Sequence, residues 1–498
     1  MTSGEIETLT RRLIPRPRSI DFTDGAEYLL KDECPITIEV SAKTGIRQKV
    51  LALCKQYWNI KPVLTLKEGA AAKKIEPEAY HLNITEKQLK VTASDWRGVA
   101  HAFKTLRQLA EAIRGTETVT GYILVPCKIK DKPAMPFRGV HICIFPETPL
   151  WDVEKQLRLA AYYKYNYAVI ECWGNFPYES HPEICWADQK LDKAELKRLV
   201  KLSKELGITL IPQLNILGHA AGARCVTAKH SVLDYNPALQ PLFEPEGWTW
   251  CLTNPHSRKI LTDLVTELHD FFDNPPFFHI GCDEAHDAGS CFKCRKYPLK
   301  DLIKEHILFF HDLFKKRNTR LIMWHDMLIE MNDERWKGYI ACASENQQLA
   351  NLYKELPKDI VIADWQYFYK KKDSNDEPTW PTTKFFKKAN FDVVACPWKD
   401  APVIESLGKM AAREKIFGML ETTWHISHTR NFLNTYLCSA YASWSPEVSQ
   451  VEYYNECIFV VFSYHIRQII WDMKIREYEK TGTAQYQVDP GHHPHVAD

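Results

Sequence analysis

The chain is constrained most by a long alternation of apolar β-type runs with amphipathic helical stretches, which begins at Phe137 and continues to Thr423. Runs that are apolar on both faces are typical of parallel strands covered by helices, and eight such strands with helical crossovers predict a (β/α)8 barrel, or TIM barrel. A doubly wound open sheet is the alternative, but no Gly-rich phosphate turn follows the first strand. The predicted strands are Arg138–Phe145, Tyr167–Cys172, Thr209–Leu214, Phe277–Cys282, Arg320–Trp324, Ile360–Trp365, Val393–Trp398 and Ile416–Thr423.

The chain is also longer than one ordinary core requires, because it has 498 residues. Residues 1–130 mix strand-like and helical runs, which predicts a smaller α+β domain. The proline-containing segment from Lys130 to Pro136 predicts the boundary after it. We therefore expect an α+β domain at 1–130, the barrel at 131–440, and a helical C-terminal segment with a polar tail at 441–498.

The fourth predicted strand ends in two adjacent carboxylates, Asp283 and Glu284. Barrel enzymes place their chemistry at the carboxyl ends of the strands, although a core strand followed by a solvated acidic turn would look similar. A metal site would need more hard ligands, and no second cluster with metal spacing is evident. Asp283-Glu284-Ala285-His286 also spells the DEAH box of helicases, but the sequence has no phosphate-binding G-x-x-x-x-G-K-[ST] loop.

Tryptophans and polar residues recur at the ends of the other predicted strands. Because the carboxyl ends of barrel strands converge on one mouth, these residues predict a pocket with aromatic walls and a polar floor. One such Trp would more often cap the core, but five in corresponding positions favour a pocket. The loop after the third strand adds His219. The strand-end residues are Glu171, Trp173, Trp324, Asp326, Trp365, Trp398, Asp400 and Trp424.

Composition excludes several classes of partner. Lys and Arg number 64 against 63 Asp and Glu, and this balance argues against a nucleic-acid partner. No apolar run approaches the ~20 residues that span a bilayer, and the N-terminus shows no secretory signal. Fifteen scattered cysteines fit reduced, cytosolic usage. We therefore expect a cytoplasmic protein without a nucleic-acid or membrane partner; a removed leader would make it periplasmic or secreted.

One cysteine pair has metal-ligand spacing. Cys291-Phe292-Lys293-Cys294 is a lone CxxC, whereas zinc sites built on this motif need a second pair of ligands. The sequence shows no such pair. It therefore predicts no metal and no cofactor, and it leaves open whether Cys291 and Cys294 bind anything.

The adjacency of Asp283 and Glu284 favours one form of glycoside hydrolysis. The usual scheme places two carboxylates on opposite sides of the scissile bond, about 5–9 Å apart, which sequence neighbours fit poorly. They fit better if a 2-acetamido group of the substrate attacks the anomeric carbon. One carboxylate then orients the amide, while the other protonates the leaving oxygen and later deprotonates water. Their proximity should separate their proton affinities.

These motifs resemble glycoside hydrolase family 20, the β-N-acetylhexosaminidases. His279-Ile280-Gly281-Cys282-Asp283-Glu284 looks like the family signature H-x-G-[GAC]-D-E. Phe137-Arg138-Gly139 is similar to the R-G of its first barrel strand, and Leu217-Gly218-His219 to its P-G-H loop. Pro397-Trp398-Lys399-Asp400 resembles its Y-x-D segment, and the N-terminal unit resembles its non-catalytic domain.

The resemblance implies a role for each candidate residue. Asp283 would polarise the acetamido group, and Glu284 would be the general acid and base of a retaining, oxazolinium mechanism. Arg138 would bind sugar hydroxyls, as would Asp400. The other implied substrate-binding residues are His219, Trp324, Trp365, Trp398 and Trp424. The expected substrate is a terminal β-linked GlcNAc or GalNAc of an oligosaccharide or glycoconjugate.

Several positions depart from the family pattern. Trp398 lacks the hydroxyl of the Y-x-D tyrosine, and no Asp clearly supports His219. Trp424 is followed by His425-Ile426 rather than by the glutamate that reads the sugar epimer. The variant second strand and Cys282 look closer to the hexosaminidase D-like branch. The alternatives are a catalytically impaired sugar-binding homologue and a glycosidase of the same fold for a modified amino sugar.

Overall fold

A computed structural model describes residues 2–448, apart from 116–118, 187, 189, 225–228, 345–347, 369–371, 373, 375–377 and 425–429, together with residues 465 and 469. The chain forms two compact units. One contains Met1–Ala134, Arg158–Lys164 and the residues from Tyr436 onward; the other contains Met135–Leu157 and Tyr165–Thr435. The expected C-terminal helical segment and polar tail fall largely outside the described residues.

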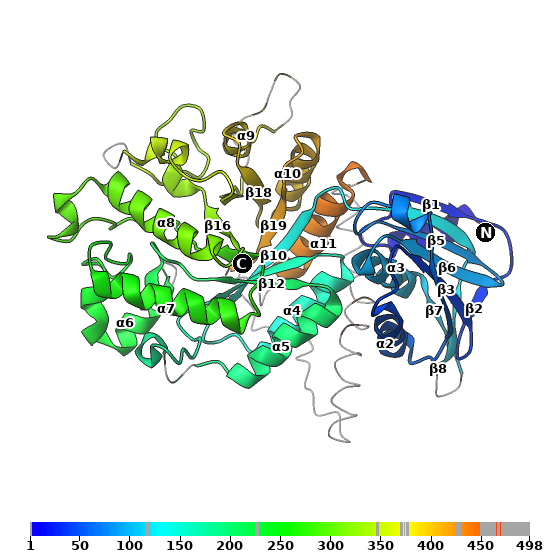
Figure 1. The fold of residues 1–498 in the computed structure, drawn as a ribbon. Helices are drawn as coiled ribbons and strands as arrows, with labels where there is room; N and C mark the ends of the chain where they lie inside the picture. Colours follow the sequence, from blue (N-terminus) through cyan, green and yellow to red (C-terminus); the bar gives the residue numbers. More distant parts are fainter. Residues whose placement is uncertain are drawn as a thin grey trace. The chain divides into compact units, whose positions relative to one another are not determined.

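The second unit is a closed barrel of eight parallel strands, as the sequence predicts (Figure 1). The first and last strands pair in parallel, which closes the sheet. Each strand lies within one or a few residues of its predicted bounds. The strands are β10 (Phe137–Ile144), β11 (Tyr167–Cys172), β12 (Thr209–Gln213), β15 (Phe277–His279), β16 (Arg320–Trp324), β17 (Val361–Trp365), β18 (Asp392–Cys396) and β19 (Gly418–Thr422).

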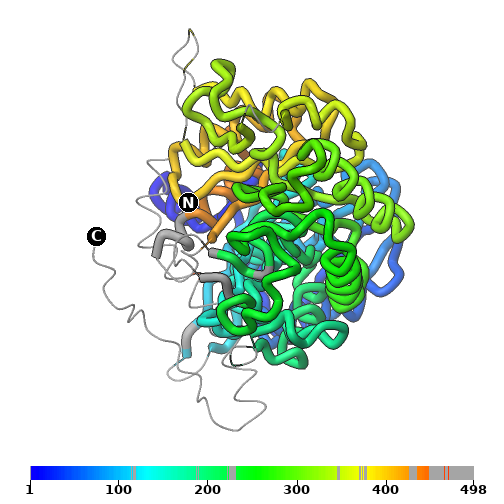
Figure 2. Tube along the Cα trace, turned by 90° about the vertical axis from the view of Figure 1, so that its left-hand side faces the viewer, coloured from blue at the N-terminus to red at the C-terminus, as the bar shows by residue number. Residues whose placement is uncertain are grey.

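Helices connect most of these strands, and Figure 2 follows the same trace in a view turned by 90°. Asp192 caps the first turn of α5 by accepting hydrogen bonds from the backbone of Ala194 and Glu195, and Gly207 ends that helix at φ 81°. Between β16 and β17 the expected helix is instead a 3-10 helix, η9 (Leu349–Lys354). The α-helices are α4 (Leu150–Tyr162), α5 (Lys193–Leu206), α6 (Ser231–Tyr235), α7 (Pro255–Phe271), α8 (Leu299–Lys315), α9 (Pro381–Lys388), α10 (Ala401–Arg413) and α11 (Arg430–Trp444).

The barrel interior is apolar at the amino ends of its strands. Phe137 stacks on Tyr167 and meets the edge of Phe277. These rings, with aliphatic side chains from the other strands, form one buried cluster. Toward the carboxyl ends the inward positions turn polar, starting with His141, Glu171 and other buried groups. Because apolar side chains fill the amino end of the barrel, a catalytic site can lie only at the carboxyl end.

The N-terminal unit is the α+β domain that the sequence predicts. Its main sheet has the order β1-β9-β5-β6-β3-β4, and a smaller sheet has the order β2-β8-β7. Residues 96–113 have an amphipathic helical pattern, but the helix ends at Leu109 because the residues that follow enter a strand. The elements are α1 (Ser3–Arg11), β1 (Ser19–Phe22), β2 (Tyr28–Leu30), β3 (Pro35–Val40), α2 (Ile46–Trp58), β4 (Val63–Glu68), β5 (Tyr80–Thr85), β6 (Gln88–Ala93), α3 (Trp96–Leu109), β7 (Glu111–Arg114), β8 (Val119–Leu124) and β9 (Cys127–Asp131).

A buried charge anchors this unit. Asp131 accepts hydrogen bonds from the hydroxyl of Tyr80 at 2.7 Å and from the indole of Trp444 at 2.9 Å. Lys164 Nζ lies 3.0 Å from the same carboxylate and is fully buried. Because each charge is paired and hydrogen-bonded, removing either partner would leave an uncompensated charge in the core.

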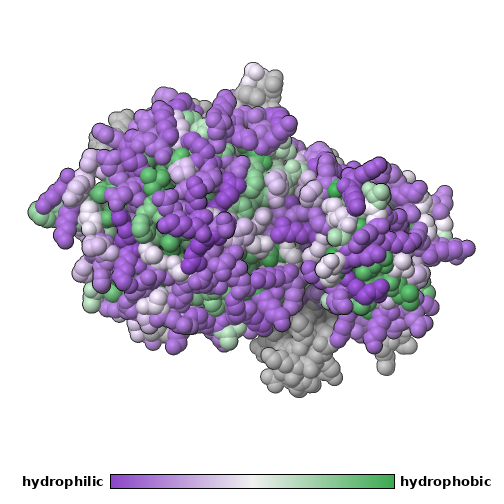
Figure 3. Space-filling model, in the orientation of Figure 1, coloured by the Kyte–Doolittle hydropathy of each residue, from purple (hydrophilic) through white to green (hydrophobic). Residues whose placement is uncertain are grey.

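Hydrophilic side chains cover most of the face shown in Figure 3. Among the helices of the described residues, none combines the length and the apolarity that a bilayer crossing requires.

Candidate active site

The two adjacent carboxylates lie just past β15 at the carboxyl end of the barrel. Their backbone is unusual, because Cys282 has φ 75° and Glu284 has φ 43°. The neighbouring loop contributes His219 at φ 50°, and the end of β19 contributes Trp424 at φ 44°. Left-handed conformations of residues other than Gly cost about 1–3 kcal/mol each and gather at functional sites. The surrounding barrel holds this backbone in a preset geometry.

His219 bridges the two acids. Its Nε2 lies 3.1 Å from Glu284 Oε2 and 3.4 Å from Asp283 Oδ2. The backbone carbonyl of Ala223, 3.0 Å away, accepts a hydrogen bond from Nδ1. The sequence shows no clear Asp to support His219, and in the structure the main-chain oxygen of Ala223 has this supporting role. Nδ1 is therefore engaged away from the acids, and Nε2 points at both.

Close packing of loops holds this arrangement. Gly218 presses on the acidic turn, since an added Cβ would lie 2.0 Å from the carbonyl oxygen of Asp283. Trp248 donates its indole N–H to the carbonyl oxygen of Glu284 at 2.6 Å, and its ring lies 4.5 Å from the His219 ring. These contacts leave little freedom for the turn, as a site with fixed geometry requires.

Charge and burial set different pKa values in this cluster. Burial raises the pKa of Asp283 to about 6, although His219 opposes the shift. Burial also disfavours a charged Glu284, but the hydrogen bond from His219 and its charge lower the pKa of Glu284 below its usual value. Burial opposes a charged His219, and the two carboxylates outweigh it, so the pKa of His219 is raised well above normal. His219 therefore holds a proton beside two carboxyl groups whose pKa values differ.

Asp326, one of the strand-end acids, hydrogen-bonds two other residues of the site. Its Oδ2 accepts the backbone N–H of Glu284 at 2.9 Å, and its Oδ1 accepts the indole N–H of Trp365 at 3.0 Å. Burial, partly offset by His325, raises the pKa of this carboxyl. Asp326 therefore ties the general-acid candidate to the aromatic wall.

Aromatic side chains from three strand ends surround Tyr367, which the sequence analysis missed. Its ring lies 5.3 Å from Trp365 and 5.2 Å from Trp398. Its hydroxyl oxygen accepts the indole N–H of Trp424 at 2.5 Å. Burial, with a smaller contribution from the charge of Asp283, raises its pKa, so the phenol stays protonated. The available signal was its position, because Tyr367 lies two residues past Trp365, where β17 ends.

Trp324 belongs to the barrel core in this structure. It has no exposed surface, and its ring packs 4.4 Å from His279 and 5.5 Å from Trp424. Trp365, Trp398 and Trp424 are half-buried. Trp324 therefore supports the aromatic wall from beneath, and the other three are placed to form it.

The structure does not bring Arg138 to this mouth, which corrects the expected hydroxyl contact. Phe137 faces the barrel interior, and so does His141, whose Nε2 lies 3.0 Å from Glu171. Because successive strand residues alternate, Arg138 faces outward near the amino end of β10. Its guanidinium Nη1 donates to the carbonyl oxygen of Met135 at 2.8 Å. The strand is buried on both faces, so its sequence gave no sign of this orientation.

Asp400 begins the helix that follows β18, and its predicted contact with the sugar stays a prediction. It is exposed, and its Oδ1 accepts the backbone N–H of Val403 at 3.0 Å as the N-cap of α10. Asp followed closely by Pro402 is a helix-start signal that the sequence carried. Residues 425–429, which follow Trp424 and include the positions expected to read the sugar epimer, lie outside the described part of the chain.

A buried polar network lies deeper in the barrel. Asn215 donates to Glu171 at 2.7 Å, and Gln213 donates to Asn215 at 3.0 Å. Glu171 also contacts His141. His279 accepts the backbone N–H of Gly281 at Nδ1, and burial holds its pKa well below normal, so it is neutral. These inward polar groups form the floor that the strand-end pattern predicts.

Comparison with known proteins bears on this site. A model of "Glycosyl hydrolase family 20, catalytic domain" matches residues 185–436, and a model of "Glycosyl hydrolase family 20, domain 2" matches residues 10–131. The chain belongs to glycosyl hydrolase family 20. The first match covers the barrel strands from β12 to β19, and the second covers most of the N-terminal α+β unit, in the order that the sequence analysis expects.

Curated relatives include a β-hexosaminidase of Vibrio furnissii, 21% identical over 84% of this chain and 73% of that protein. β-Hexosaminidase 1 of Coccidioides posadasii is 24% identical over 59% of this chain, which spans only 54% of that relative's length. Hexosaminidase D of Bos taurus is 24% identical over 35% of this chain and 50% of that protein. Placement in the hexosaminidase D-like branch stays a prediction.

Solved structures agree on the fold. A chitobiase of Flavobacterium johnsoniae has a TM-score of 0.68 with 17% identity and covers 93% of this chain and 73% of its own. A β-N-acetylhexosaminidase of Bacteroides fragilis has a TM-score of 0.67 with 16% identity and covers 92% of this chain and 96% of its own. At these identities the likeness concerns the fold, a family 20 barrel preceded by a smaller domain.

Proposed function

We propose that the chain is an exo-β-N-acetylhexosaminidase that removes terminal β-linked GlcNAc or GalNAc with retention of configuration. The observation that carries this proposal is that Asp283 and Glu284 both face one nitrogen of His219. Two carboxylates grouped on one side of a site cannot flank the anomeric carbon from opposite sides. The substrate must then supply the nucleophile, and an N-acetyl group can do so.

In the proposed mechanism, ionised Asp283 accepts the acetamido N–H and stabilises the positive charge that develops there. The acetamido oxygen attacks the anomeric carbon as the leaving oxygen departs, which forms an oxazolinium ring. Glu284 gives a proton to the leaving oxygen and then takes one from the attacking water. In the free site Glu284 has a low pKa, and His219 donates to it at 3.1 Å, so His219 is the source of that proton.

The direct test is turnover of aryl β-N-acetylglucosaminide and aryl β-N-acetylgalactosaminide. Hydrolysis with a β-configured first product, and inhibition by a thiazoline mimic of the bicyclic intermediate, would support the proposal. Sugar binding without turnover on either substrate would instead support the non-catalytic alternative. The ratio of the two rates gives the preferred epimer.

Tyr367 should act on the acetamido group in place of the missing Y-x-D tyrosine. Its oxygen accepts from Trp424 and its hydroxyl also lies against Thr422, so the proton of Tyr367 would have to turn from Thr422 to the acetamido oxygen. We expect Tyr367→Phe to lower kcat/KM by about 10- to 100-fold, the value of a hydrogen bond to a charged group. Tyr297→Phe, which alters an exposed tyrosine, is the matched control. Equal activity of the two variants would remove Tyr367 from the site.

The pH dependence of kcat/KM should be bell-shaped. Asp283 must be ionised, and its pKa is about 6, so activity should fall as pH drops through about 6 rather than near 4. The stored proton is lost as pH rises through the raised pKa of His219, so the alkaline limb should lie above pH 6.5. Both limbs belong to the coupled cluster. An acid limb at the ordinary carboxyl value would contradict the proposed role of Asp283.

We also propose that the protein works in a reducing compartment. None of the thirteen cysteines among the described residues is in a disulfide, and this usage supports a cytoplasmic location.

A further inference from the structure

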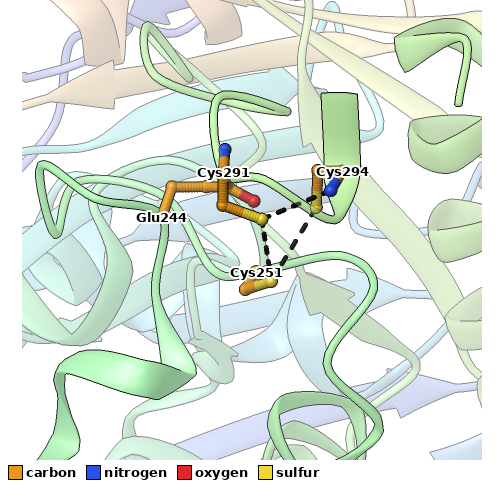
Figure 4. A group of neighbouring side chains, drawn as sticks. All are labelled: Glu244, Cys251, Cys291 and Cys294. Atoms are coloured by element: carbon orange, nitrogen blue, oxygen red, sulfur yellow. Dashed lines mark hydrogen bonds between the residues drawn. The ribbon is translucent and has the colours of Figure 1, made fainter. Parts of the chain in front are cut away.

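Two residues from a distant loop, Glu244 and Cys251, lie beside the two cysteines of the CxxC. Glu244 and Cys251 lie between η5 (Pro237–Leu242) and α7, whereas Cys291 and Cys294 lie between β15 and α8. Figure 4 shows the Glu244 carboxylate and the three sulfurs turned toward one another. One ligand atom from each residue lies within 4.8 Å of the others. The second ligand pair that the CxxC lacks in sequence is therefore supplied by the fold.

The sulfur spacing matches a tetrahedral metal site. Cys251 Sγ lies 3.8 Å from Cys291 Sγ and 3.8 Å from Cys294 Sγ. Sulfurs at the corners of a tetrahedron with Zn–S bonds of 2.3 Å are about 3.8 Å apart. A disulfide would need an S–S distance of about 2.05 Å, and three thiols cannot all be paired. The observed separation is that of thiolates around a common centre.

Glu244, the fourth group, has one carboxylate oxygen without a hydrogen-bond partner. Glu244 is fully buried, and its Oε2 accepts the backbone N–H of Cys291 at 2.6 Å. Its Oε1 is buried without a hydrogen-bond partner. A buried carboxylate oxygen in that state is costly unless a cation or proton satisfies it. A carboxylate oxygen of Glu244 lies within 4.8 Å of the three sulfurs, so Glu244 offers a fourth ligand.

Two polar groups lie against the sulfurs. The backbone N–H of Cys294 donates to Cys291 Sγ at 3.3 Å, and the hydroxyl of Thr253 lies 3.2 Å from Cys294 Sγ. Lys293 lies within the CxxC, and Arg295 and Lys296 follow it directly, so three positive charges are close in sequence to the two thiols. Hydrogen bonds to ligand atoms and nearby opposite charge are what metal-bound thiolates need.

We propose that Glu244, Cys251, Cys291 and Cys294 bind one Zn²⁺. Soft thiolates in a tetrahedral set select zinc over the hard cations Mg²⁺ and Ca²⁺. Four protein ligands leave no open position, so the ion is structural. It ties the loop that carries Trp248 to the segment that follows the acidic turn. Since Trp248 holds the carbonyl of Glu284, the ion would stabilise the loops around the general-acid candidate.

Metal analysis of the whole chain, purified with reduced thiols and without chelator, tests this. We expect about one zinc per chain. After exchange, Co²⁺ should give the thiolate charge-transfer absorption and intense visible bands of a tetrahedral site. Protein that holds no zinc and shows no such spectrum with added Co²⁺ would overturn the proposal. A disulfide among the three cysteines, found by thiol counting and peptide mapping, would overturn it too.

Zinc content of single-residue variants tests which residues hold the ion. Cys251→Ser and Cys294→Ser should reduce bound zinc to below about a tenth of an equivalent, and Glu244→Gln should release zinc to a chelator faster than the unaltered protein. Cys54→Ser removes a buried thiol of α2 in the other unit and should keep full zinc. If Cys54→Ser loses as much zinc as Cys251→Ser, the ion is not held where we place it. The Co²⁺ spectrum of the unaltered chain keeps the test valid if one variant fails to fold.

Discussion

Replacing Glu284 with Gln is expected to lower kcat on unactivated N-acetylhexosaminides by about 10²- to 10⁴-fold, the range of a lost general acid and base. Gln keeps the size of the side chain and can still face His219, but it cannot give a proton to the leaving oxygen. The loss should shrink for aryl substrates whose leaving group needs no proton. For those substrates the second step becomes slow, because water no longer has a base.

The measurement is a comparison of kcat for substrates with good and poor leaving groups, with and without azide. Azide needs no base and should restore turnover of the activated substrate, giving a β-glycosyl azide. Glu305→Gln, which changes an exposed glutamate of α8 paired with Arg258, is the control and should keep normal rates. Full activity of Glu284→Gln would show that another group is the acid.

Replacing Asp283 with Asn should produce a loss of about 10²- to 10³-fold, the value of one preorganised group aimed at developing charge. Unlike the loss in Glu284→Gln, this one should depend on the substrate's acetamido group rather than on its leaving group. Asn cannot carry the negative charge that an oxazolinium needs nearby. The residual rate on an aryl β-glucoside, which lacks the acetamido group, should change little.

Binding of the thiazoline mimic gives a second measurement. The inhibitor resembles the charged bicyclic intermediate, so its Ki should rise in Asp283→Asn roughly in step with the loss of kcat/KM. Asp301→Asn, which removes an exposed carboxylate of α8, should leave both unchanged. If Asp283→Asn affects glucoside and N-acetylglucosaminide equally, Asp283 positions Glu284 and does not contact the acetamido group.

The sequence was sufficient for the barrel but not for the orientation of every side chain. Eight apolar runs with helical spacers predicted the strands, since a parallel strand covered on both sides is apolar throughout. That same uniformity hid which residues of β10 face inward. Every residue of this strand is buried, so no alternation separated inward His141 from outward Arg138.

The acidic pair could be found from sequence because its members are adjacent, whereas its partners come from other strands. His219 was found through its loop motif. Tyr367 was not predicted because the family motif puts a tyrosine at the position of Trp398, whereas this fold supplies a hydroxyl from the end of the preceding strand. Cys251 lies beside Cys291 although 40 residues separate them in the sequence. Metal-ligand motifs are recognised by short spacings, so the sequence did not reveal this neighbour. Asp400 also caps α10, a role that its position just before Pro402 signalled in the sequence.

The left-handed backbone at Cys282, Glu284, His219 and Trp424 sets stability and turnover against each other. Gly adopts such conformations without the steric cost that other residues bear. Selection for thermal resistance alone would therefore favour Gly at these positions and erase the side chains that the chemistry needs. The rest of the barrel must be stable enough to carry this local cost, which limits how many destabilising changes it can accumulate elsewhere.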